Sequence, residues 1–496
     1  MIIATLLASL SLLSNGSHAT KDIPITLSSE STSYDGNTIT FDKNVSVTHH
    51  IGKIKAGSAT ITGNTNEKKS QFHTLQLRDN VSIDIKEGTN FHCQYAELNS
   101  LTLTGLFSGT KNNSPVIYRD LYTNSEGTAI PIMLRSLIMN VKLFKPSTNT
   151  DKEQNSYVVN NLFAQNSVIL NYGNDFTAFA DKAIYHYIPR RDAKNSEDTF
   201  SGMIFLLPLS KSSLCRVITR DRDFINAKEM RFDTEKKTIS CMQATGQLRL
   251  NASLNNMQFS AGTISWDTQQ KRITLNKPII IKQKQWGILT NEDKVLFNGA
   301  HADNKRFDSI ICLGETTWSH VDIIHGNTHD VTCHGIMSID QNSGTISFES
   351  PLENGSTPID KQIIYNTTTS TVRADTMTIF CDMNEKIMTP QSIAIEGNVK
   401  IFNKGSLRPG DTTPVLQYAI ADSVEYSSDM KHLTLRAQEN KRVLFLDRIN
   451  NMQMSANAIE ITKNSNEMES IRGIGTTRFT FNEEEFIQLK EQFNLS

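Results

Sequence analysis

The sequence predicts an all-β fold made of repeated antiparallel hairpins, and three observations support this prediction. A short phrase, FDKNVSV at Phe41–Val47, recurs as LRDNVSI at Leu77–Ile83 and as IEGNVKI at Ile395–Ile401. Apolar and polar residues alternate on both sides of each phrase. Turn-forming Asp, Asn and Gly residues separate the alternating segments. Together these features are typical of strands joined by tight turns.

The alternation shows which face of each strand is apolar. Ile39, Phe41, Val45 and Val47 are all odd-numbered, and polar residues lie between them. Because side chains in a strand point alternately to opposite faces, this spacing predicts a half-buried strand. The parity continues through the central Asp-Lys-Asn, so we predict a bulge there rather than a strand end. The same spacing recurs in Leu75, Leu77, Val81 and Ile83, in Ile273, Leu275, Ile279 and Ile281, and in Ile393, Ile395, Val399 and Ile401.

A second phrase precedes the first and supplies the other strand of each hairpin. An alanine is followed five residues later by a large side chain, as from Ala261 to Trp266 and from Ala421 to Tyr426. A turn such as Asp267-Thr268-Gln269 follows, where the Asp side chain can bond to nearby backbone N–H groups. The predicted unit is therefore strand, turn, strand, bulge, strand, repeated from residue 30 to residue 481. Such units bury an apolar face only by stacking on one another.

Both ends of the chain differ from the repeat. Residues 2–13 are apolar and are followed by Ser17-His18-Ala19, which predicts a secretory signal peptide cleaved after Ala19. Near the other end, Asn482 and three Glu residues precede apolar residues spaced i, i+3 and i+7. This arrangement predicts a short C-terminal helix.

The rhythm of the repeat also divides the chain. It is clear near both ends and interrupted between residues 106 and 222, which we interpret as an insertion or a diverged β region. The expected regions are the signal peptide over 1–19, an N-terminal β-repeat region over 20–105, the insertion or diverged region over 106–222, a central β-repeat region over 223–350, a C-terminal β-repeat region over 351–481 and the helix over 482–496.

Composition limits the function classes. The chain has 496 residues, enough for several domains or for one elongated repeat array. Its formal net charge is −2, which does not favour a nucleic-acid partner. The six cysteines form no CxxC motif, which argues against zinc-ribbon and thioredoxin-like sites. We expect the cysteines to be small buried side chains, and the sequence leaves disulfide pairing open.

Motifs that carry catalytic chemistry are not found in the sequence. It has no GxSxG, P-loop, HExxH or dinucleotide-binding fingerprint, so we expect no enzyme, no cofactor and no metal. His320, His325, His329 and His334 do lie close together, near Cys333. Their spacing fits no zinc finger, so the sequence favours a polar sheet surface over a metal site there.

The order of the phrases resembles the OstA or LptA family of lipopolysaccharide-transport proteins. The residues that carry the resemblance are Ala-Asp-x-Val-x-Tyr at Ala421–Tyr426 and Glu-Gly-Asn-Val-x-Ile at Glu396–Ile401. Tyr34-Asp35, Asn44-Val45 and Ala56–Ala59 repeat the pattern near the N-terminus. Members of the family form a periplasmic bridge between the two membranes of Gram-negative bacteria.

The resemblance implies a twisted β-jellyroll whose two sheets splay like a folded taco, with lipid acyl chains in the apolar seam between them. It implies a periplasmic location, with association with the outer membrane as a further expectation. The implied partners are lipopolysaccharide or a similar lipid, other lipopolysaccharide-transport proteins joined by edge-strand pairing, and further copies of the chain joined head to tail. The residues expected to line the seam are Ile39, Phe41, Val45, Val47, Ile393, Ile395, Val399, Ile401, Val424, Leu433, Leu435 and Ile461.

Two other functions stay open at the level of sequence. One is a structural or interaction β-solenoid of the cell envelope, in which the same residues are plain core. The other, less favoured, is a polysaccharide-acting β-helix enzyme, which would need a cleft with converging carboxylates.

Overall fold

The computed structural model confirms the predicted all-β fold for the residues that it describes. The structure describes residues 26–49, 52–64, 71–85, 90–99, 101–110, 114–123, 129–144, 158–187, 202–220, 222–234, 236–249, 256–284, 287–299, 307–321, 328–382, 389–404, 416–427, 432–448, 452–463 and 469–480. These residues form strands β1 to β37 and one 3-10 turn, Ile359–Lys361, with no α-helix among them. The signal peptide predicted over 1–19 and the helix predicted over 482–496 lie outside the described residues.

The chain divides into two compact units, residues 1–246 and 247–496. The strands that begin in the first unit are β1 (Thr26–Ser28), β2 (Ser31–Tyr34), β3 (Thr38–His49), β4 (Gly52–Asn64), β5 (Gln71–Ile85), β6 (Asn90–Asn99), β7 (Thr104–Ser108), β8 (Val116–Thr123), β9 (Ala129–Ser136), β10 (Ile138–Phe144), β11 (Val158–Tyr172), β12 (Phe176–Tyr187), β13 (Gly202–Leu207), β14 (Cys215–Thr219), β15 (Phe224–Ala227), β16 (Glu229–Asp233) and β17 (Thr238–Arg249).

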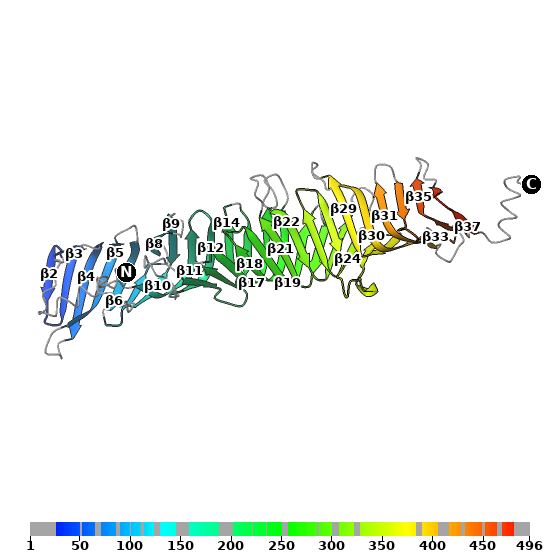
Figure 1. Cartoon of the computed structure of the whole chain (residues 1–496). Coiled ribbons are helices and arrows are strands. Elements are labelled where there is room, and N and C mark those ends of the chain that lie inside the picture. Colours follow the sequence, from blue (N-terminus) through cyan, green and yellow to red (C-terminus); the bar gives the residue numbers. More distant parts are fainter. Residues whose placement is uncertain are drawn as a thin grey trace, which may run out of the picture. The chain divides into compact units, whose positions relative to one another are not determined.

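The second unit carries the remaining strands. They are β18 (Asn256–Asp267), β19 (Arg272–Gln283), β20 (Gly287–Asn291), β21 (Lys294–Gly299), β22 (Phe307–Leu313), β23 (Thr316–Val321), β24 (Thr328–Cys333), β25 (Ile336–Asp340), β26 (Thr345–Glu349), β27 (Ile363–Asn366), β28 (Ser370–Ala374), β29 (Thr376–Asp382), β30 (Thr389–Lys404), β31 (Leu416–Ser427), β32 (His432–Arg436), β33 (Val443–Asp447), β34 (Met452–Ala456), β35 (Ala458–Lys463), β36 (Glu469–Ile474) and β37 (Arg478–Thr480). In each unit, neighbouring strands lie side by side and pair antiparallel (Figure 1).

The predicted bulges are present in the long strands. Lys43 and Asn44 have positive φ (57° and 52°), and the register of β3 with β4 shifts between Asp42 and Val45. In β30, Gly397 and Asn398 also have positive φ (80° and 48°), and the register with β31 shifts between Glu396 and Val399. Gly, Asn and Asp tolerate left-handed backbone better than other residues, which explains why they occupy these phrases. Each long strand therefore bends at its middle and continues.

The bends allow one long strand to serve two ladders. In the second unit, residues 273–276 of β19 pair with β21, while residues 279–283 pair with β20. One ladder, called ladder 1, runs β19–β21–β22–β25–β26–β29–β30. The other, ladder 2, runs β19–β20–β23–β24–β27–β28–β30. The two ladders therefore rejoin at β30, which bends in the same way as β19.

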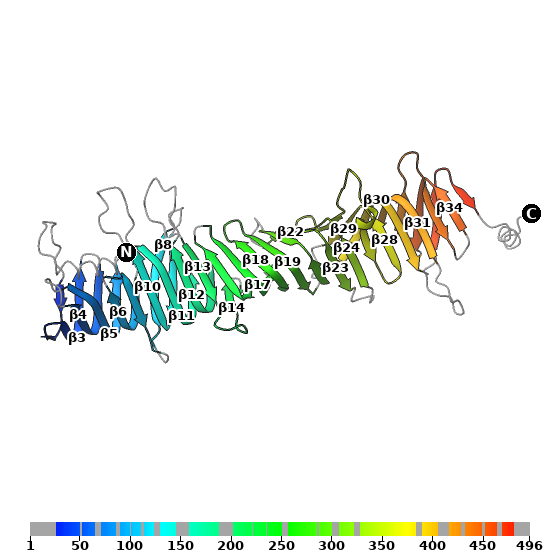
Figure 2. The same cartoon turned by 90° about the horizontal axis from the view of Figure 1, so that it is seen from below.

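Both ladders continue past β30 to the last described strands. Ladder 1 proceeds through residues 423–427 of β31 to β32, β35 and β36. Ladder 2 proceeds through residues 417–420 of β31 to β33, β34 and β37. Figure 2 shows the two layers within this unit, with β23, β24 and β28 in one layer and β22 and β29 in the other.

The first unit repeats this arrangement. Residues 95–99 of β6 pair with β7, and residues 90–92 pair with β8. One ladder continues through β10 and the other through β9, and both reach β11. β11 bends at Asn166 and Ser167, which both have positive φ. Most of the described residues between 106 and 222 thus lie in strands of the same two-ladder pattern.

The predicted Asp turns close the hairpins. The Oδ1 atom of Asp267 accepts the backbone N–H groups of Gln269 and Gln270 at 3.0 and 2.9 Å. Asp35 accepts those of Asn37 and Thr38 at 3.0 and 2.7 Å, and these bonds lower the pKa of its carboxyl below the usual value. Because the carboxylate replaces a backbone acceptor, the chain reverses within a few residues.

Candidate functional site

The apolar space between ladder 1 and ladder 2 of the second unit is the candidate functional site. Side chains on the facing sides of the two ladders form rows, in which each residue is paired with the next across neighbouring strands. In ladder 1 one row consists of Ile273, Phe297, Ile310, Ile339, Ile346, Ile379, Ile393, Tyr426, Leu433, Ile461 and Ile471. We call this the isoleucine row.

Other apolar rows complete the seam. Between the isoleucine row and the bends lie Leu275, Val295, Cys312, Met337, Phe348, Met377, Ile395, Val424, Leu435 and Ile459. The facing row of ladder 2 consists of Ile281, Leu289, Trp318, Val331, Tyr365, Val372, Ile401, Ala419, Phe445, Met454 and Phe479. An apolar surface therefore continues from β19 to the last described strands of this unit.

The two ladders touch through these rows. The ring of Trp318 in ladder 2 lies 6.1 Å from that of Phe348 in ladder 1, centroid to centroid. In the first unit, Tyr172 and Phe176 pack against Phe232 at 4.7 and 5.3 Å. These three residues also come from different ladders. Tyr172 and Phe176 lie at the ends of β11 and β12 on the ladder that continues to β14, whereas Phe232 lies in β16, on the ladder that passes through β13. Aromatic pairs at such separations add to the stability that burial gives.

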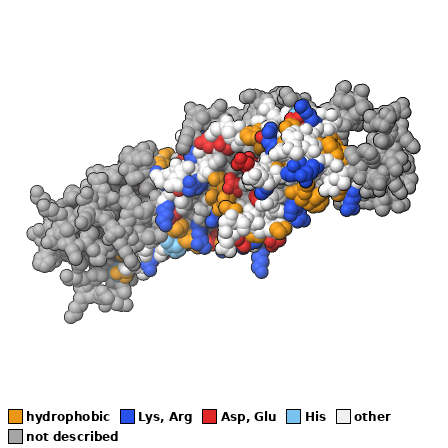
Figure 3. All heavy atoms as spheres, turned by 45° about the vertical axis from the view of Figure 1, so that its right-hand side comes forward, with side chains coloured by type: hydrophobic (Ala, Val, Ile, Leu, Met, Phe, Trp, Pro, Cys, Tyr) orange, Lys and Arg blue, Asp and Glu red, His pale blue; other side chains and the backbone are white. Residues whose placement is uncertain are grey.

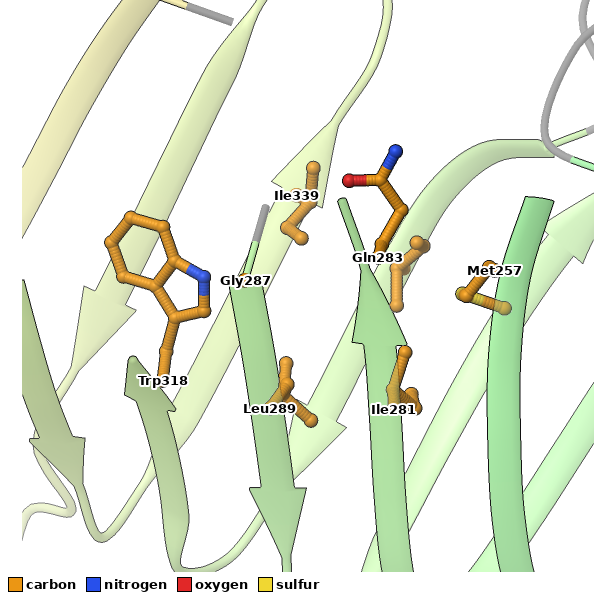
Figure 4. Close-up of a pocket in the computed structure, with 8 residues that line it drawn as sticks. Met257, Ile281, Gln283, Gly287, Leu289, Trp318 and Ile339 are labelled. Carbon is orange, nitrogen blue, oxygen red and sulfur yellow. The ribbon is translucent and has the colours of Figure 1, made fainter. Parts of the chain in front are cut away.

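A small cavity lies between the ladders. Ile310 and Ile339 of ladder 1 and Leu289 and Trp318 of ladder 2 line it together (Figure 4). Its free volume is about 10 Å³, close to the room that one water molecule needs. In this conformation the protein's own side chains therefore fill the seam at this point.

The predicted seam residues all lie on the inner side of their strands, but they fall in two units. Ile39, Phe41, Val45 and Val47 belong to the first unit, and the other eight belong to the second. Those with less than a tenth of their surface exposed are Phe41, Val45, Val47, Ile395, Val399, Val424 and Leu435. Those that are half-buried are Ile39, Ile393, Ile401, Leu433 and Ile461.

Exposure within the isoleucine row rises toward the C-terminal strands. Ile273 and Ile310 are 1% and 2% exposed, whereas Ile393, Leu433 and Ile461 are half-buried and Tyr426 is 37% exposed. Phe479, the last residue of the facing row, is 51% exposed. The isoleucine row is thus partly exposed between β30 and β36, whereas Ala419, Phe445 and Met454 of the facing row are at most 4% exposed.

A polar row borders the seam on ladder 2, and sequence reasoning missed it. Its polar side chains are Gln283, His320, His329, Thr367, Ser370, Asn403, Gln417 and Asp447; Gly287 pairs with Gln283 and leaves a gap before His320, and Met452 pairs with Asp447 and ends the row. Each of these residues lies two positions beyond an apolar residue of the ladder 2 row, farther from the bend. Extending the alternation past Ile401 to Asn403, and back from Ala419 to Gln417, would have found part of it.

Hydrogen bonds join the polar row across strands. Ser370 Oγ donates to Asn403 Oδ1 at 3.3 Å, and Asn403 Nδ2 donates to Gln417 Oε1 at 3.1 Å. Gln417 Nε2 then donates to Asp447 Oδ2 at 3.2 Å. Farther along the row, the rings of His320 and His329 stack at 6.3 Å, and His329 Nδ1 lies 2.8 Å from the hydroxyl of Tyr365.

The histidine cluster is spread over different environments. His320 and His329 face each other on β23 and β24, and His334 Nδ1 lies 3.9 Å from Glu315 Oε2. Cys333 is buried, and His325 lies outside the described residues. Within the described ranges, no group of three His, Cys, Asp or Glu side chains is placed to hold a metal ion.

All six cysteines are buried, as the sequence predicts, and none forms a disulfide. Burial raises the pKa of the Cys241 and Cys312 thiols to about 12. Since the thiolate is the reactive form, these thiols react slowly while the protein is folded.

We expect iodoacetamide at pH 8 to modify Cys241 and Cys312 at least about a hundredfold more slowly in the native chain than in guanidinium chloride. Mass spectrometry of peptides taken over time measures both rates in one sample. Native rates that equal the denatured rates would show that these strands are not packed as described.

On the face shown in Figure 3, Lys and Arg side chains are interspersed with Asp and Glu and with hydrophobic side chains. No helix in the described part of the chain is long and apolar enough to cross a membrane.

Comparisons with known proteins add little. No family model matches the chain, and no curated protein matches it. Among the solved structures that match is LptH, the LptA-homologous periplasmic component of the lipopolysaccharide transport device of Pseudomonas aeruginosa; the match covers 31% of this chain and 94% of that one. The identity is 8% and the TM-score is 0.23. A match of this quality does not establish a shared fold.

Proposed function

We propose that the chain is a non-enzymatic periplasmic carrier or bridge for lipopolysaccharide, or a similar lipid, on its way to the outer membrane. The observation that carries this proposal is the continuous apolar seam between two antiparallel ladders, whose isoleucine row is partly exposed between β30 and β36. In this reading the two ladders are the splayed sheets of a taco-like jellyroll, and acyl chains lie between them.

The energetics favour an acyl chain over water in such a seam. Each methylene taken out of water contributes about 0.8 kcal/mol. The cavity near Trp318 has room for little more than one water, so a chain enters only if the ladders separate. The half-buried residues Ile393, Ile401, Leu433 and Ile461 mark where that separation costs least, because they already contact solvent.

The edge strands suggest how a bridge would extend. Among the described residues, β36 pairs with β35 and β37 pairs with β34, so each leaves one side for a further strand. In the described part of the first unit, β1 and β2 each pair with β3, so each likewise leaves one side for a further strand. Such edges bind other strands readily. We therefore propose edge-to-edge pairing with other lipopolysaccharide-transport proteins or with further copies of this chain.

A photo-crosslinking amino acid at Ile401, with Lys400 as the matched control, tests the carrier function in Gram-negative cells. Ile401 is half-buried and lies on the seam side, and Lys400 points to the opposite face of the same strand. We expect lipopolysaccharide adducts from Ile401 and none from Lys400. Val399 is a poorer position, because it is fully buried beside the bend.

The structural or interaction protein is the second candidate, and the filled seam favours it. Phe297, Phe307 and Phe348 are at most 1% exposed, so the interior is packed by the chain itself. If neither Ile401 nor Lys400 gives a lipid adduct in exported, folded protein, the carrier function is wrong and this candidate replaces it. Equal adducts from both positions would contradict the seam as the lipid site.

A further inference from the structure

We infer that the polar row of ladder 2 is a headgroup-binding track that selects an uncharged, hydroxyl-rich headgroup, such as the saccharide of a glycolipid. This inference rests on the proposed function and narrows its cargo to a similar lipid with an uncharged glycosyl headgroup, since the lipid anchor of lipopolysaccharide carries phosphate groups. It concerns the residues from Gln283 to Asp447 defined above, none of which lies in the apolar rows.

Position is the first argument. The polar row directly adjoins the apolar row of ladder 2, since Asn403 follows Ile401 by two residues and Gln417 precedes Ala419 by two. An amphiphile with chains against Ile401 and Ala419 would therefore place its headgroup beside Asn403 and Gln417. On ladder 1 the positions two beyond the isoleucine row include Gly299, Gly344 and Cys381, so a row of polar side chains is interrupted there.

Hydrogen-bonding capacity is the second argument. Each side-chain amide carries two N–H donors and two acceptor lone pairs. The bonds from Ser370 to Asn403, from Asn403 to Gln417 and from Gln417 to Asp447 fix the amides in one orientation and leave capacity on each for a ligand. Asn403 and Gln417 are half-buried, so the remaining groups are accessible. Alternating donors and acceptors along one line suit a series of hydroxyl groups, each of which both donates and accepts.

Charge is the third argument, and it decides between headgroup classes. The polar row contains one carboxylate, Asp447, and no Lys or Arg. Phosphate recognition in proteins relies on Arg, Lys or clustered backbone N–H groups. Lys282 and Lys284 flank Gln283 in sequence, but their side chains are exposed on the other face of the strand. A neutral headgroup therefore fits the row better than an anionic one.

The rings of the row add a flat surface. The ring of His320 stacks on Trp318 at 6.0 Å, and that of His329 stacks on Tyr365 at 6.1 Å. With the His320–His329 contact, four rings form a continuous strip at the border of the seam. The apolar face of a pyranose ring can pack on such a strip while its hydroxyls reach the amides.

Binding of two probes to the purified full chain tests the inference. The probes are a dodecyl glycoside and dodecyl phosphate below their micellar concentrations, measured by titration calorimetry. The variant is Gln417→Leu, and the matched control is Gln453→Leu, which changes an exposed glutamine on the outer face of β34.

We expect tighter binding of the glycoside than of the phosphate by the unchanged protein. Gln417→Leu should weaken glycoside binding about tenfold and change phosphate binding less than about twofold. Gln453→Leu should change neither.

The outcomes separate the two proposals. If both probes bind with equal affinity and Gln417→Leu affects neither, the seam binds chains but the headgroup track is wrong. Tighter binding of dodecyl phosphate that Gln417→Leu weakens would overturn the choice of an uncharged headgroup. If neither probe binds, both the carrier function and the track fail. Should Gln417→Leu lower the melting temperature strongly, Asn403→Leu replaces it, with the same expected loss of glycoside binding.

Discussion

Phe348→Ala lowers the free energy of unfolding of the second unit by about 3–5 kcal/mol, which is the usual cost of removing a buried phenyl group. Phe348 is 1% exposed, occupies the inner row of ladder 1 and packs against Trp318 of ladder 2. Its removal leaves a cavity where the two ladders touch, and short strands that are paired on both sides cannot move to fill it. The seam is thus also the core on which the unit's stability depends.

Urea unfolding followed by tryptophan fluorescence measures this effect. The three tryptophans of the chain, Trp266, Trp286 and Trp318, all belong to the second unit, so the signal reports that unit. Phe380→Ala is the matched control, because Phe380 lies on neighbouring β29 and is 41% exposed. We expect the control to change stability by about 0.5 kcal/mol or less. Equal losses from both substitutions would contradict a closed seam between the ladders.

Gly397→Ala destabilises the second unit through the bend of β30. Gly397 has a φ of 80°, where an alanine costs about 1–2 kcal/mol by conformation alone. An added Cβ would also lie 2.7 Å from the Cβ of Asp375 and 2.5 Å from its Oδ2. Asp375 cannot easily withdraw, because its carboxylate accepts hydrogen bonds from Asn398 Nδ2 at 2.8 Å and from Gln362 Nε2 at 2.9 Å. We therefore expect a loss clearly above the conformational cost.

Gly355→Ala measures the conformational cost of an alanine at positive φ without a steric contact. Gly355 has nearly the same φ, 81°, but no atom lies within 4 Å of the position that a Cβ would take. Its substitution should cost only the conformational part, and the same urea measurement compares the two variants. If the two glycines give equal losses, contact with Asp375 does not hold the bend. If neither gives a loss, the bend is not built on left-handed backbone.

Much of the local structure follows from the sequence. The odd-numbered apolar residues Ile395 and Val399 are buried, and Glu396 between them is exposed, as the alternation predicts. The bends at Asn44 and Asn398 are equally local, because left-handed backbone selects Asn and Gly. The bend of β11 escaped prediction because Ser167 separates Asn166 from Val168 and hides the Asn-Val phrase.

The candidate site is only partly predictable. The parity of β30 indicates that Ile401 faces the interior, but it does not reveal that Val372 and Ala419 lie beside it. Asn403, Gln417 and Asp447 belong to three strands, and nothing local signals that they form one hydrogen-bonded row. Their alignment depends on the register of each strand pair, which is set by the packing of the whole unit.

Outside residues 106–222, the sequence by itself determined the strands of the recurring hairpins, their apolar faces and the bends at Asn44, Asn80 and Asn398, because these depend on side-chain parity and on residues that accept positive φ. Only the tertiary structure decided that each bent strand serves two ladders, that isoleucines from β19 to β36 align in one row and that a polar row borders the seam. The physical reason is that backbone hydrogen bonding between strands is the same for every residue type. Which strands pair, and in which register, is therefore decided by burial of the apolar faces between the two ladders and not by any single segment.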